Sequence, residues 1–460
     1  MRMFLMLMIM MMTSAFAMAQ ETYGIKIAGE DITGYNRYDL TEISGVSGTV
    51  YFDPNTRTLT LDNATIEADD YNAILNETCD YLLIELIGTN TIDVTGAAGI
   101  YLKEETTIWS NSGGKLTLTN DRCALLFEGC PLEINNCWLE VEGDWGISAN
   151  NNVAEEVFTI RNSHVEVKGP TGSICDIADL KLEGCYIDEP VNAAYDADVK
   201  SVALNGVTVT DKVVIKPDSY GIKIAGVDVT SLNSKDLSVI DGVDGKINYN
   251  SETKTLTMED VTINANVNGI NNEGVKDLKI EVVGNNAITS NTACIAISET
   301  SAISGSGTLS LKSNDNCGLY MYNSSLTVEG VKLYAEGDYG VAGVDGKSGE
   351  ILTLRNAYVE ATGSKGSICD LQNLVLDGCA ITQPTGAAFD ANVHGVALNG
   401  EVVTDKVVIE SATNGISDIT TDVPAHAKGI YSVTGVKQTQ QWNELPAGIY
   451  IVDGVKRVKK

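Results

Sequence analysis

Residues 158–167 read Phe-Thr-Ile-Arg-Asn-Ser-His-Val-Glu-Val, and this stretch decides the fold. Apolar side chains alternate with polar ones on both sides of Asn162, a period of two that is typical of β-strands. Asn tolerates a left-handed backbone at low cost, so Asn162 marks a sharp bend between two short strands. The stretch therefore predicts a unit of strand, one-residue bend and strand.

The same ten-residue pattern recurs along the chain. It begins at Leu59, Leu132, Phe158, Leu180, Val202, Leu256, Leu326, Leu352, Leu374 and Val396. Its fifth position, the bend, holds Asn63, Asn136, Asn162, Gly184, Gly206, Asp260, Gly330, Asn356, Gly378 and Gly400. All ten are residue types that tolerate a left-handed backbone. The last three units of each half are 22 residues apart (158, 180, 202 and 352, 374, 396), a typical solenoid period.

We therefore predict an all-β chain folded as a right-handed parallel β-helix, with residues 82–86 and 278–282 as further coils. An antiparallel β-sandwich also uses short strands and turns. Its turns would not hold Asn, Asp or Gly at one fixed phase ten times, so the pattern favours the β-helix.

The chain contains two copies of one module. Residues 23–29, Tyr-Gly-Ile-Lys-Ile-Ala-Gly, recur identically at 220–226, and several later segments recur at nearly the same offset. We assign residues 20–219 to β-helix module one and residues 220–411 to β-helix module two.

The opening segment of each module, residues 23–52 and 220–249, lacks the coil pattern. The end of a solenoid must cover an open core and an unpaired strand edge, so we expect both segments to be caps. Two caps favour two capped helices in tandem. One continuous stack is the alternative, because the junction at residues 216–219 is short.

The start of the chain predicts its cellular location, and its net charge limits the classes of partner. Residues 1–19 have a basic start, a short apolar run and an Ala-Met-Ala end, so we predict a signal peptide cleaved before Gln20, or alternatively after Ala17. No later apolar run is long enough for a transmembrane helix. The formal net charge of -31 argues against nucleic acid and anionic membranes as partners. It favours neutral glycans, or acidic glycans bridged by calcium, over free polyanions.

Stacked coils place equal positions of the repeat in columns about 4.8 Å apart per coil. One column collects the rings of Trp138, His164 and Tyr186, and its neighbour the carboxylates of Glu140, Glu166 and Asp188. We expect the rings on consecutive coils, where they would stack on sugars while the carboxylates bind hydroxyl groups or calcium. Tyr358 and Glu360 keep a weaker form of this surface in module two. The alternative is an ordinary solvated face whose aromatic pairs stabilise the sheet.

Two Gly-Asp-aromatic-Gly loops are also retained between the modules. They hold Asp144 and Trp145 in module one, and Asp338 and Tyr339 in module two. An exposed ring on such a loop is a candidate ligand contact. A tight bend whose ring packs on the coil is equally consistent with the pattern.

Arg161 and Arg355 occupy the same position in the two modules. A retained arginine suits the base of a polysaccharide lyase, but each arginine faces an acid on the next coil, Glu183 or Asp377. We predict cross-coil ion pairs and assign no catalytic residue.

Ten cysteines lie in a chain expected to be exported, so disulfides are permitted. Cys175 and Cys185 recur as Cys369 and Cys379, which leaves a retained pair open. Three cysteines of module one have no counterpart in module two, and this irregularity favours buried thiols that act as small hydrophobic side chains. No Cys-x-x-Cys, EF-hand or nucleotide-binding motif occurs. We predict no required cofactor, and consider calcium as a ligand without a defined metal site.

The coils resemble secreted right-handed parallel β-helix proteins, which include pectate lyases and carbohydrate-binding β-helix domains. The start of each module, the heptapeptide followed by Thr58–Leu61 or Thr255–Met258, is similar to carbohydrate-binding domain-containing surface proteins of Bacteroidetes. This resemblance covers residues 22–411 and implies a glycan ligand. It supplies no catalytic motif that matches residues of this chain.

The tail has a separate resemblance. After a linker at 412–428, the segments 429–436, 445–452 and 454–460 read as three short strands with Gly turns. Residues 429–460 are similar to the C-terminal sorting domain of the type IX secretion system. This resemblance implies contact with that secretion machinery and a place outside the cell or on its outer surface. A small β cap on the helix is the alternative.

We therefore expect a secreted or cell-surface protein that binds a glycan without catalysis. A structural adhesin or surface protein with no glycan ligand is the second hypothesis. A polysaccharide lyase or glycoside hydrolase is the third.

Overall fold

The computed structural model describes residues 21–150, 153–411, 429–433, 435–453 and 455–460. The predicted signal peptide (1–19) and linker (412–428) lie outside these residues. The chain divides between Glu410 and Ser411 into two compact units. No helix in the described ranges has both the length and the apolar character needed to cross a membrane.

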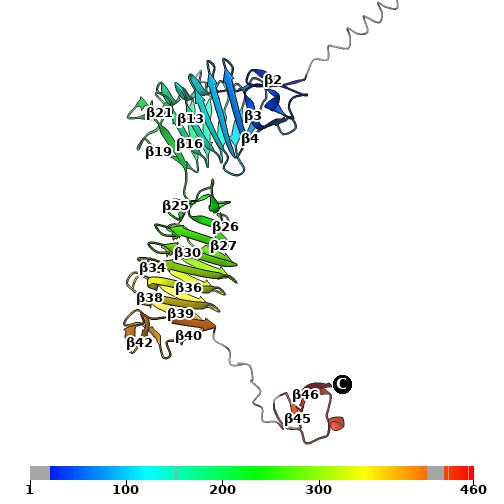
Figure 1. Cartoon of the computed structure of the whole chain (residues 1–460), viewed down its shortest axis with the longest axis vertical. Coiled ribbons are helices and arrows are strands. Elements are labelled where there is room, and N and C mark those ends of the chain that lie inside the picture. The colour runs from blue at the N-terminus through cyan, green and yellow to red at the C-terminus, as the bar shows by residue number, and fades with distance from the viewer. Residues whose placement is uncertain (1–20, 151–152, 412–428, 434, 454) are drawn as a thin grey trace, which may run out of the picture. The chain divides into compact units, whose positions relative to one another are not determined.

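Module one is a parallel β-solenoid, as the repeat predicts, and each full coil contributes one strand to each of three ladders (Figure 1). Ladder one stacks β6 (Leu82–Ile87), β9 (Thr106–Trp109), β12 (Leu132–Asn135), β15 (Val157–Arg161) and β18 (Asp179–Glu183). Ladder two stacks β7 (Thr89–Thr95), β10 (Lys115–Asn120), β13 (Trp138–Glu142) and β16 (His164–Lys168). Ladder three stacks β5 (Ile74–Asn76), β8 (Ile100–Leu102), β11 (Cys123–Phe127), β14 (Trp145–Ala149) and β17 (Gly172–Cys175). The first coil opens with β4 (Thr58–Asp69), which pairs with β6 and then with β7.

Module two repeats this plan. Its ladder one holds β29 (Leu278–Val283), β32 (Ser301–Gly305), β35 (Ser325–Glu329), β37 (Ile351–Arg355) and β39 (Asn373–Asp377). Its ladder two holds β30 (Asn285–Ser290), β33 (Thr308–Ser313), β36 (Lys332–Ala342) and β38 (Tyr358–Cys369). Ladder three holds β28 (Ile270–Asn272), β31 (Ile295–Ile297), β34 (Cys317–Met321) and the second halves of β36 and β38, and β27 (Thr255–Ala265) opens the stack.

All ten predicted bend residues have a positive φ, between 45° and 85°. Six of them join ladder one to ladder two, while Gly184 and Gly378 join ladder one to β19 (Cys185–Glu189) and β40 (Cys379–Gln383). The other two, Gly206 and Gly400, do not: they turn antiparallel hairpins between β21 (Ser201–Leu204) and β22 (Val207–Thr208), and between β42 (Gly395–Leu398) and β43 (Glu401–Val402). The assignment of the units at Val202 and Val396 as coils is therefore wrong. A hairpin turn also requires left-handed residues, so the pattern alone does not separate the two cases.

Both opening segments are caps, as predicted. In module one the cap consists of β1 (Thr22–Ile27), β2 (Glu30–Thr33), η1 (Leu40–Glu42) and β3 (Val46–Asp53). In module two it consists of β24 (Ile222–Ile224), β25 (Val227–Asp228), η2 (Leu237–Val239) and β26 (Val243–Asn250). Strands β3 and β26 pair antiparallel with β4 and β27, so each covers the free edge of a first coil.

The far end of each module is closed by strands that depart from the regular coil arrangement. In module one β19 (Cys185–Glu189), β20 (Ala194–Asp196) and the β21–β22 hairpin are followed by β23 (Val213–Pro217). In module two the same order is β40 (Cys379–Gln383), β41 (Ala388–Asp390), the β42–β43 hairpin and β44 (Val407–Ser411). Strand β23 returns antiparallel between β16 and β19, and β44 does the same between β38 and β40.

Each module buries its own aliphatic core, one between Ile25 and Ile215 and the other between Ile222 and Ile409. Inward positions of the strands supply the core: Leu139 and Val165, for example, are fully buried neighbours on ladder two. Burial of each such side chain contributes about 1.5–3 kcal/mol. Two cores with two sets of caps correspond to two capped solenoids in tandem.

The C-terminal unit contains a three-stranded antiparallel sheet, as its motifs predict. Its strands are β45 (Ile430–Ser432), β46 (Gly448–Val452) and β47 (Val455–Lys459), and η3 (Trp442–Glu444) precedes β46.

Candidate functional site

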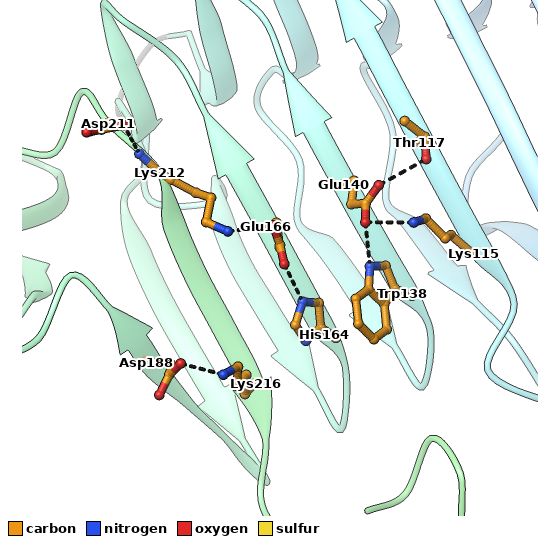
Figure 2. Close-up of polar contacts among 10 residues, drawn as sticks. All are labelled: Lys115, Thr117, Trp138, Glu140, His164, Glu166, Asp188, Asp211, Lys212 and Lys216. Atoms are coloured by element: carbon orange, nitrogen blue, oxygen red, sulfur yellow. Dashed lines mark hydrogen bonds and ion pairs between the residues drawn. The ribbon is translucent and has the colours of Figure 1, made fainter. Parts of the chain in front are cut away.

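The outward face of ladder two in module one carries the predicted rings and carboxylates (Figure 2). Trp138 and His164 begin β13 and β16 and lie directly opposite each other. Their rings stack with centroids 3.7 Å apart and planes 19° from parallel. This contact leaves His164 only 6% exposed, so its ring packs against protein instead of offering a free face to a ligand.

Tyr186 does not lie directly beside His164, so the expectation of three adjacent rings on consecutive coils is wrong. Strand β23 lies between β16 and β19 and places Lys216 opposite Tyr186. The column therefore runs from Trp138 to His164, then Lys216, then Tyr186. The ring of Tyr186 remains available, because it is 45% exposed.

Glu140 is held by three donors. Its Oε1 accepts from Lys115 Nζ at 2.6 Å and from Trp138 Nε1 at 3.1 Å, and its Oε2 accepts from Thr117 Oγ1 at 3.3 Å. Partial burial by itself would raise the pKa of Glu140, but the hydrogen bonds from Lys115 and Trp138 outweigh it and lower the pKa below its ordinary value. Glu140 is therefore ionised at neutral pH and fixes the plane of the indole.

Glu166 binds the next ring. Its Oε1 lies 3.0 Å from His164 Nε2, and its Oε2 accepts from Lys212 Nζ at 2.9 Å. Burial lowers the pKa of His164, although the contact with Glu166 acts in the opposite direction. Neutral His164 thus carries its proton on Nε2 and donates it to Glu166. Burial by itself would raise the pKa of Glu166, but the bonds with Lys212 and His164 lower it.

Asp188, the third predicted carboxylate, pairs with Lys216 at 2.6 Å. All three acids of the column are thus bonded to protein cations or donors, as Figure 2 shows. The arrangement is an ordered ionic row with two aromatic ends, Trp138 and Tyr186. Such a row can hold hydroxyl groups through its remaining lone pairs, and the lowered pKa values of Glu140 and Glu166 keep both of these acids ionised.

A cavity of about 640 Å³ opens beside this row. Trp138, His164, Tyr186 and Lys216 line it from module one, together with Asp228, Asn233 and Asp241 from the module-two cap. A separate groove of about 200 Å³ lies along the strands, lined by Glu140, Glu166, Lys168 and Lys212 among others. The ring column therefore lines a cavity that the sequence pattern does not predict.

The module-two cap reaches module one through the loop that follows β25. Ser231 Oγ donates to the backbone oxygen of Asn162 at 3.1 Å, and Lys235 Nζ donates to the backbone oxygen of Asn111 at 2.6 Å. The cap therefore contributes polar groups to the cavity. The sequence carries no signal for this contact, because Asn111 and Lys235 are 124 positions apart.

Module two keeps part of the row. Tyr358 Oη donates to Glu360 at 3.0 Å, and Lys406 pairs with Glu360 at 2.5 Å. Burial and the bond to Glu360 raise the pKa of Tyr358 to about 12, and the bond from Lys406 lowers the pKa of Glu360. Lys406 corresponds to Lys212, and the recurrence of Thr-Asp-Lys at 210–212 and 404–406 is the signal that could have identified both.

The two Gly-Asp-aromatic-Gly loops lie where ladder three begins, away from the ring column. Asp144 and Trp145 are exposed, the latter at 39%. In module two Asp338 bonds to Ser364 and Lys365, and the ring of Tyr339 packs against a small cluster that includes Cys317 and Cys369. The packed-bend alternative thus describes Tyr339, whereas Trp145 stays a candidate contact.

Both retained arginines form the predicted cross-coil ion pairs. Arg161 bonds to Glu183 and also to Glu133, and Arg355 bonds to Asp377 at 2.9 Å. Each guanidinium thus has acids on both sides, since Glu329 pairs with Arg355 as well.

All ten cysteines lie in the described part of the chain, and all are free thiols, nine of them buried. The prediction of buried thiols is confirmed. Burial raises the pKa of Cys137 to about 12. Among the described residues no group of three or more His, Cys, Asp or Glu side chains is placed to hold a metal ion.

Comparisons of the chain with protein-family models, with curated proteins and with solved structures found no match.

Proposed function

We propose that this chain is a non-catalytic glycan-binding protein that acts outside the cell. The observation that carries the proposal is the cavity of about 640 Å³ beside Trp138 and Tyr186. Small-ligand sites commonly enclose 300–1,000 Å³, which is room for a short saccharide. The exposed ring of Tyr186 offers a flat apolar surface of the kind on which a pyranose face stacks.

The polar groups around the cavity suit hydroxyl groups. Lys216 supplies donors, Asp228 and Asp241 supply acceptors, and Asn233 supplies both. Several of these groups already hold protein partners, so they are ordered before a ligand arrives. Preorganised groups lose less conformational entropy on binding, which favours affinity.

The charge of the chain narrows the ligand class. A formal net charge of -31 repels free polyanions, so neutral glycans are the preferred ligands. Acidic glycans bridged by calcium are the second form of the proposal. The acids of the ring column already pair with lysines, which balance their charge. A neutral ligand can therefore bind without an added cation.

The location follows from the two ends of the sequence. The signal-like residues 1–19 direct the chain across the inner membrane, and residues 429–460 are similar to the C-terminal sorting domain of the type IX secretion system. The resemblance of the modules to Bacteroidetes carbohydrate-binding surface proteins agrees with this route. We infer a released or surface-attached protein whose tail is read by that machinery.

Glycan-array screening of residues 20–460, followed by calorimetric titration with and without calcium, tests the proposal. Tyr186→Ala should weaken binding of the selected glycan about tenfold, the range of one aromatic contact. Tyr322→Ala, which removes a ring that is 50% exposed on module two, is the matched control and should leave affinity unchanged. Unsaturated or shortened glycan products would instead support a lyase or hydrolase. Absence of binding to every glycan would support a structural surface protein.

A further inference from the structure

The cap of module one carries a loop, residues 33–39, that module two repeats as residues 230–236. In each loop the fourth residue accepts a hydrogen bond from the backbone N–H of the first, at 2.7 Å for Asn36 and 2.9 Å for Asn233. The last residue of each loop is an Asp that caps the following 3-10 helix. The two loops are therefore copies with the same local structure.

The second copy of the loop is docked within the chain. Ser231 and Lys235 donate hydrogen bonds to backbone oxygens of Asn162 and Asn111, at 3.1 and 2.6 Å. The two acceptors lie in bends between ladder one and ladder two of module one. Loop 230–236 thus recognises coil bends of a preceding module.

Within the described residues, no β-helix coil comes before the first copy. Tyr35 and Tyr38 occupy the positions of Leu232 and Lys235, and they are 85% and 69% exposed. Two large rings on one loop, outside the core, are costly to leave in water unless they meet a partner. Loop 33–39 is therefore an unpartnered version of a docking element that this chain already uses.

Module two offers part of the matching surface, because it repeats the bend at Asn162 but has a shorter bend where module one holds Asn111. Its bend residue Asn356 repeats Asn162, with φ values of 45° and 48°. Beside this bend, Tyr358 takes the place of His164. The ring centroids of Tyr334 and Tyr358 are 5.6 Å apart, and Tyr334 remains 37% exposed. Aromatic side chains thus lie on both faces, a composition common at protein interfaces.

We propose that loop 33–39 of one copy docks on the module-two bends around Asn356 of a second copy, so that the protein assembles head to tail. Tyr35 and Tyr38 would lie beside Tyr334 and Tyr358, as loop 230–236 lies across a shared cavity from Trp138 and His164. Arg37 also adds a positive charge that suits Glu410, which takes the place that Lys216 has in module one.

This contact joins two different surfaces, so it is heterologous and leaves one free end on every added copy. The expected product is an open series of oligomers instead of a closed dimer. The proposal is independent of glycan binding, because neither loop 33–39 nor Asn356 lines the cavity beside Trp138.

Sedimentation velocity of residues 20–460 over a concentration series tests the assembly. The wild-type protein should form a series of oligomers whose size increases as the protein concentration is raised to about 100 µM, the range of a transient interface. The double variant Tyr35→Ser with Tyr38→Ser should weaken association at least ~30-fold, because each ring is a central contact. Tyr322→Ser is the matched control and should associate like the wild type.

A second variant blocks the opposite surface. Ser306 is exposed in the bend between β32 and β33, where module one has the docking segment at 111–113. Ser306→Arg should also give a monomer, because its long side chain fills the receiving surface. An equimolar mixture of the two variants should form dimers and nothing larger, since each partner supplies one intact surface.

Three results would overturn the proposal: a wild-type protein that stays monomeric throughout, oligomers that persist in both variants, or a mixture that stays monomeric. A dimer that persists in Ser306→Arg but not in the tyrosine double variant would also overturn it, and would show a symmetric contact between two identical loops. Circular dichroism melts matching the wild type would show that each variant is folded.

Discussion

Lys212 forms an ion pair with Glu166 at 2.9 Å. The pair links the start of the returning strand β23 to β16, which belongs to the last full coil of module one. Lys406 and Glu360 repeat the pair in module two at 2.5 Å. Each lysine precedes the strand, β23 or β44, that enters the ladder in the opposite direction. The pair therefore lies where the regular solenoid ends. In module one, the last residues of the ring column, Lys216 and Tyr186, follow at this end.

Removal of this lysine gives the first prediction. In Lys212→Met the pKa of Glu166 should rise toward its ordinary 4.5, because the largest favourable contact of the carboxylate is lost. The free energy of unfolding should fall only slightly, since an exposed ion pair contributes little to stability. Carboxyl titration by NMR and urea unfolding measure the two effects. Lys406→Met is the control, and it should leave the titration of Glu166 unchanged.

The pH dependence of module one is the second prediction. The folded pKa of His164 is lowered below 6.5 by burial, so unfolding takes up a proton at this site when the pH falls. Its contribution to stability is complete above pH 6.5 and is lost as the pH falls through the folded value. Glu140 and Glu166, whose folded pKa values are also lowered, add a further loss below pH 4.5.

His164→Tyr separates the two steps, because it copies the residue that module two has at this position. Thermal melts between pH 7.5 and 4 should show the loss just below pH 6.5 in the wild type but not in the variant. If the variant loses stability over the same interval as the wild type, His164 is not the titrating group.

The repeat predicts much of this fold because its evidence is local. A left-handed backbone at Asn162 depends on that residue alone, and inward alternation at Phe158 and Ile160 depends on near neighbours. Arg161 is equally predictable, since a parallel ladder places equal positions of adjacent coils together. The ion pairs of both arginines followed from this rule.

The site is less predictable because its contacts are not periodic. Strand β23 has the same alternation whether it extends the stack or returns antiparallel, so its position between His164 and Tyr186 has no local signal. The docking of Lys235 on Asn111 depends on contacts between segments distant in the sequence. The ring types at this face were foreseeable, whereas their order and the cavity beside them were not.

The coil bends give the third prediction. Gly184 has a φ of 62°, and a Cβ added there would lie 2.3 Å from Asn162 Oδ1 on the preceding coil. Gly184→Ala should therefore cost more than the ~1–2 kcal/mol of a left-handed alanine alone. Asn162→Gly should be nearly neutral, because glycine adopts the same φ without strain. Denaturant unfolding curves of the two variants measure the difference, and equal losses would contradict it.

The thiols give the fourth prediction. Burial raises the pKa of Cys137 and Cys175 to about 12, so neither is a thiolate at neutral pH. Native protein should react with iodoacetamide at no more than the partly exposed Cys123, and denatured protein at all ten cysteines. Dithiothreitol should leave the melting temperature unchanged. A mass deficit of two hydrogens per pair before reduction would show disulfides and contradict the prediction.

The last prediction concerns the cap of module two as part of the glycan site. Lys235 does not line the cavity, but its bond to Asn111 holds loop 230–236, which carries Asn233, against module one. Lys235→Ala should release this loop and lower glycan affinity several-fold, because an ordered wall of the cavity becomes mobile before binding. Calorimetric titration measures the change. Lys246→Ala, which removes an exposed ion pair with Glu259 from the same cap, should leave affinity intact. Unchanged affinity in Lys235→Ala, together with a loss in Tyr186→Ala, would restrict the binding surface to module one.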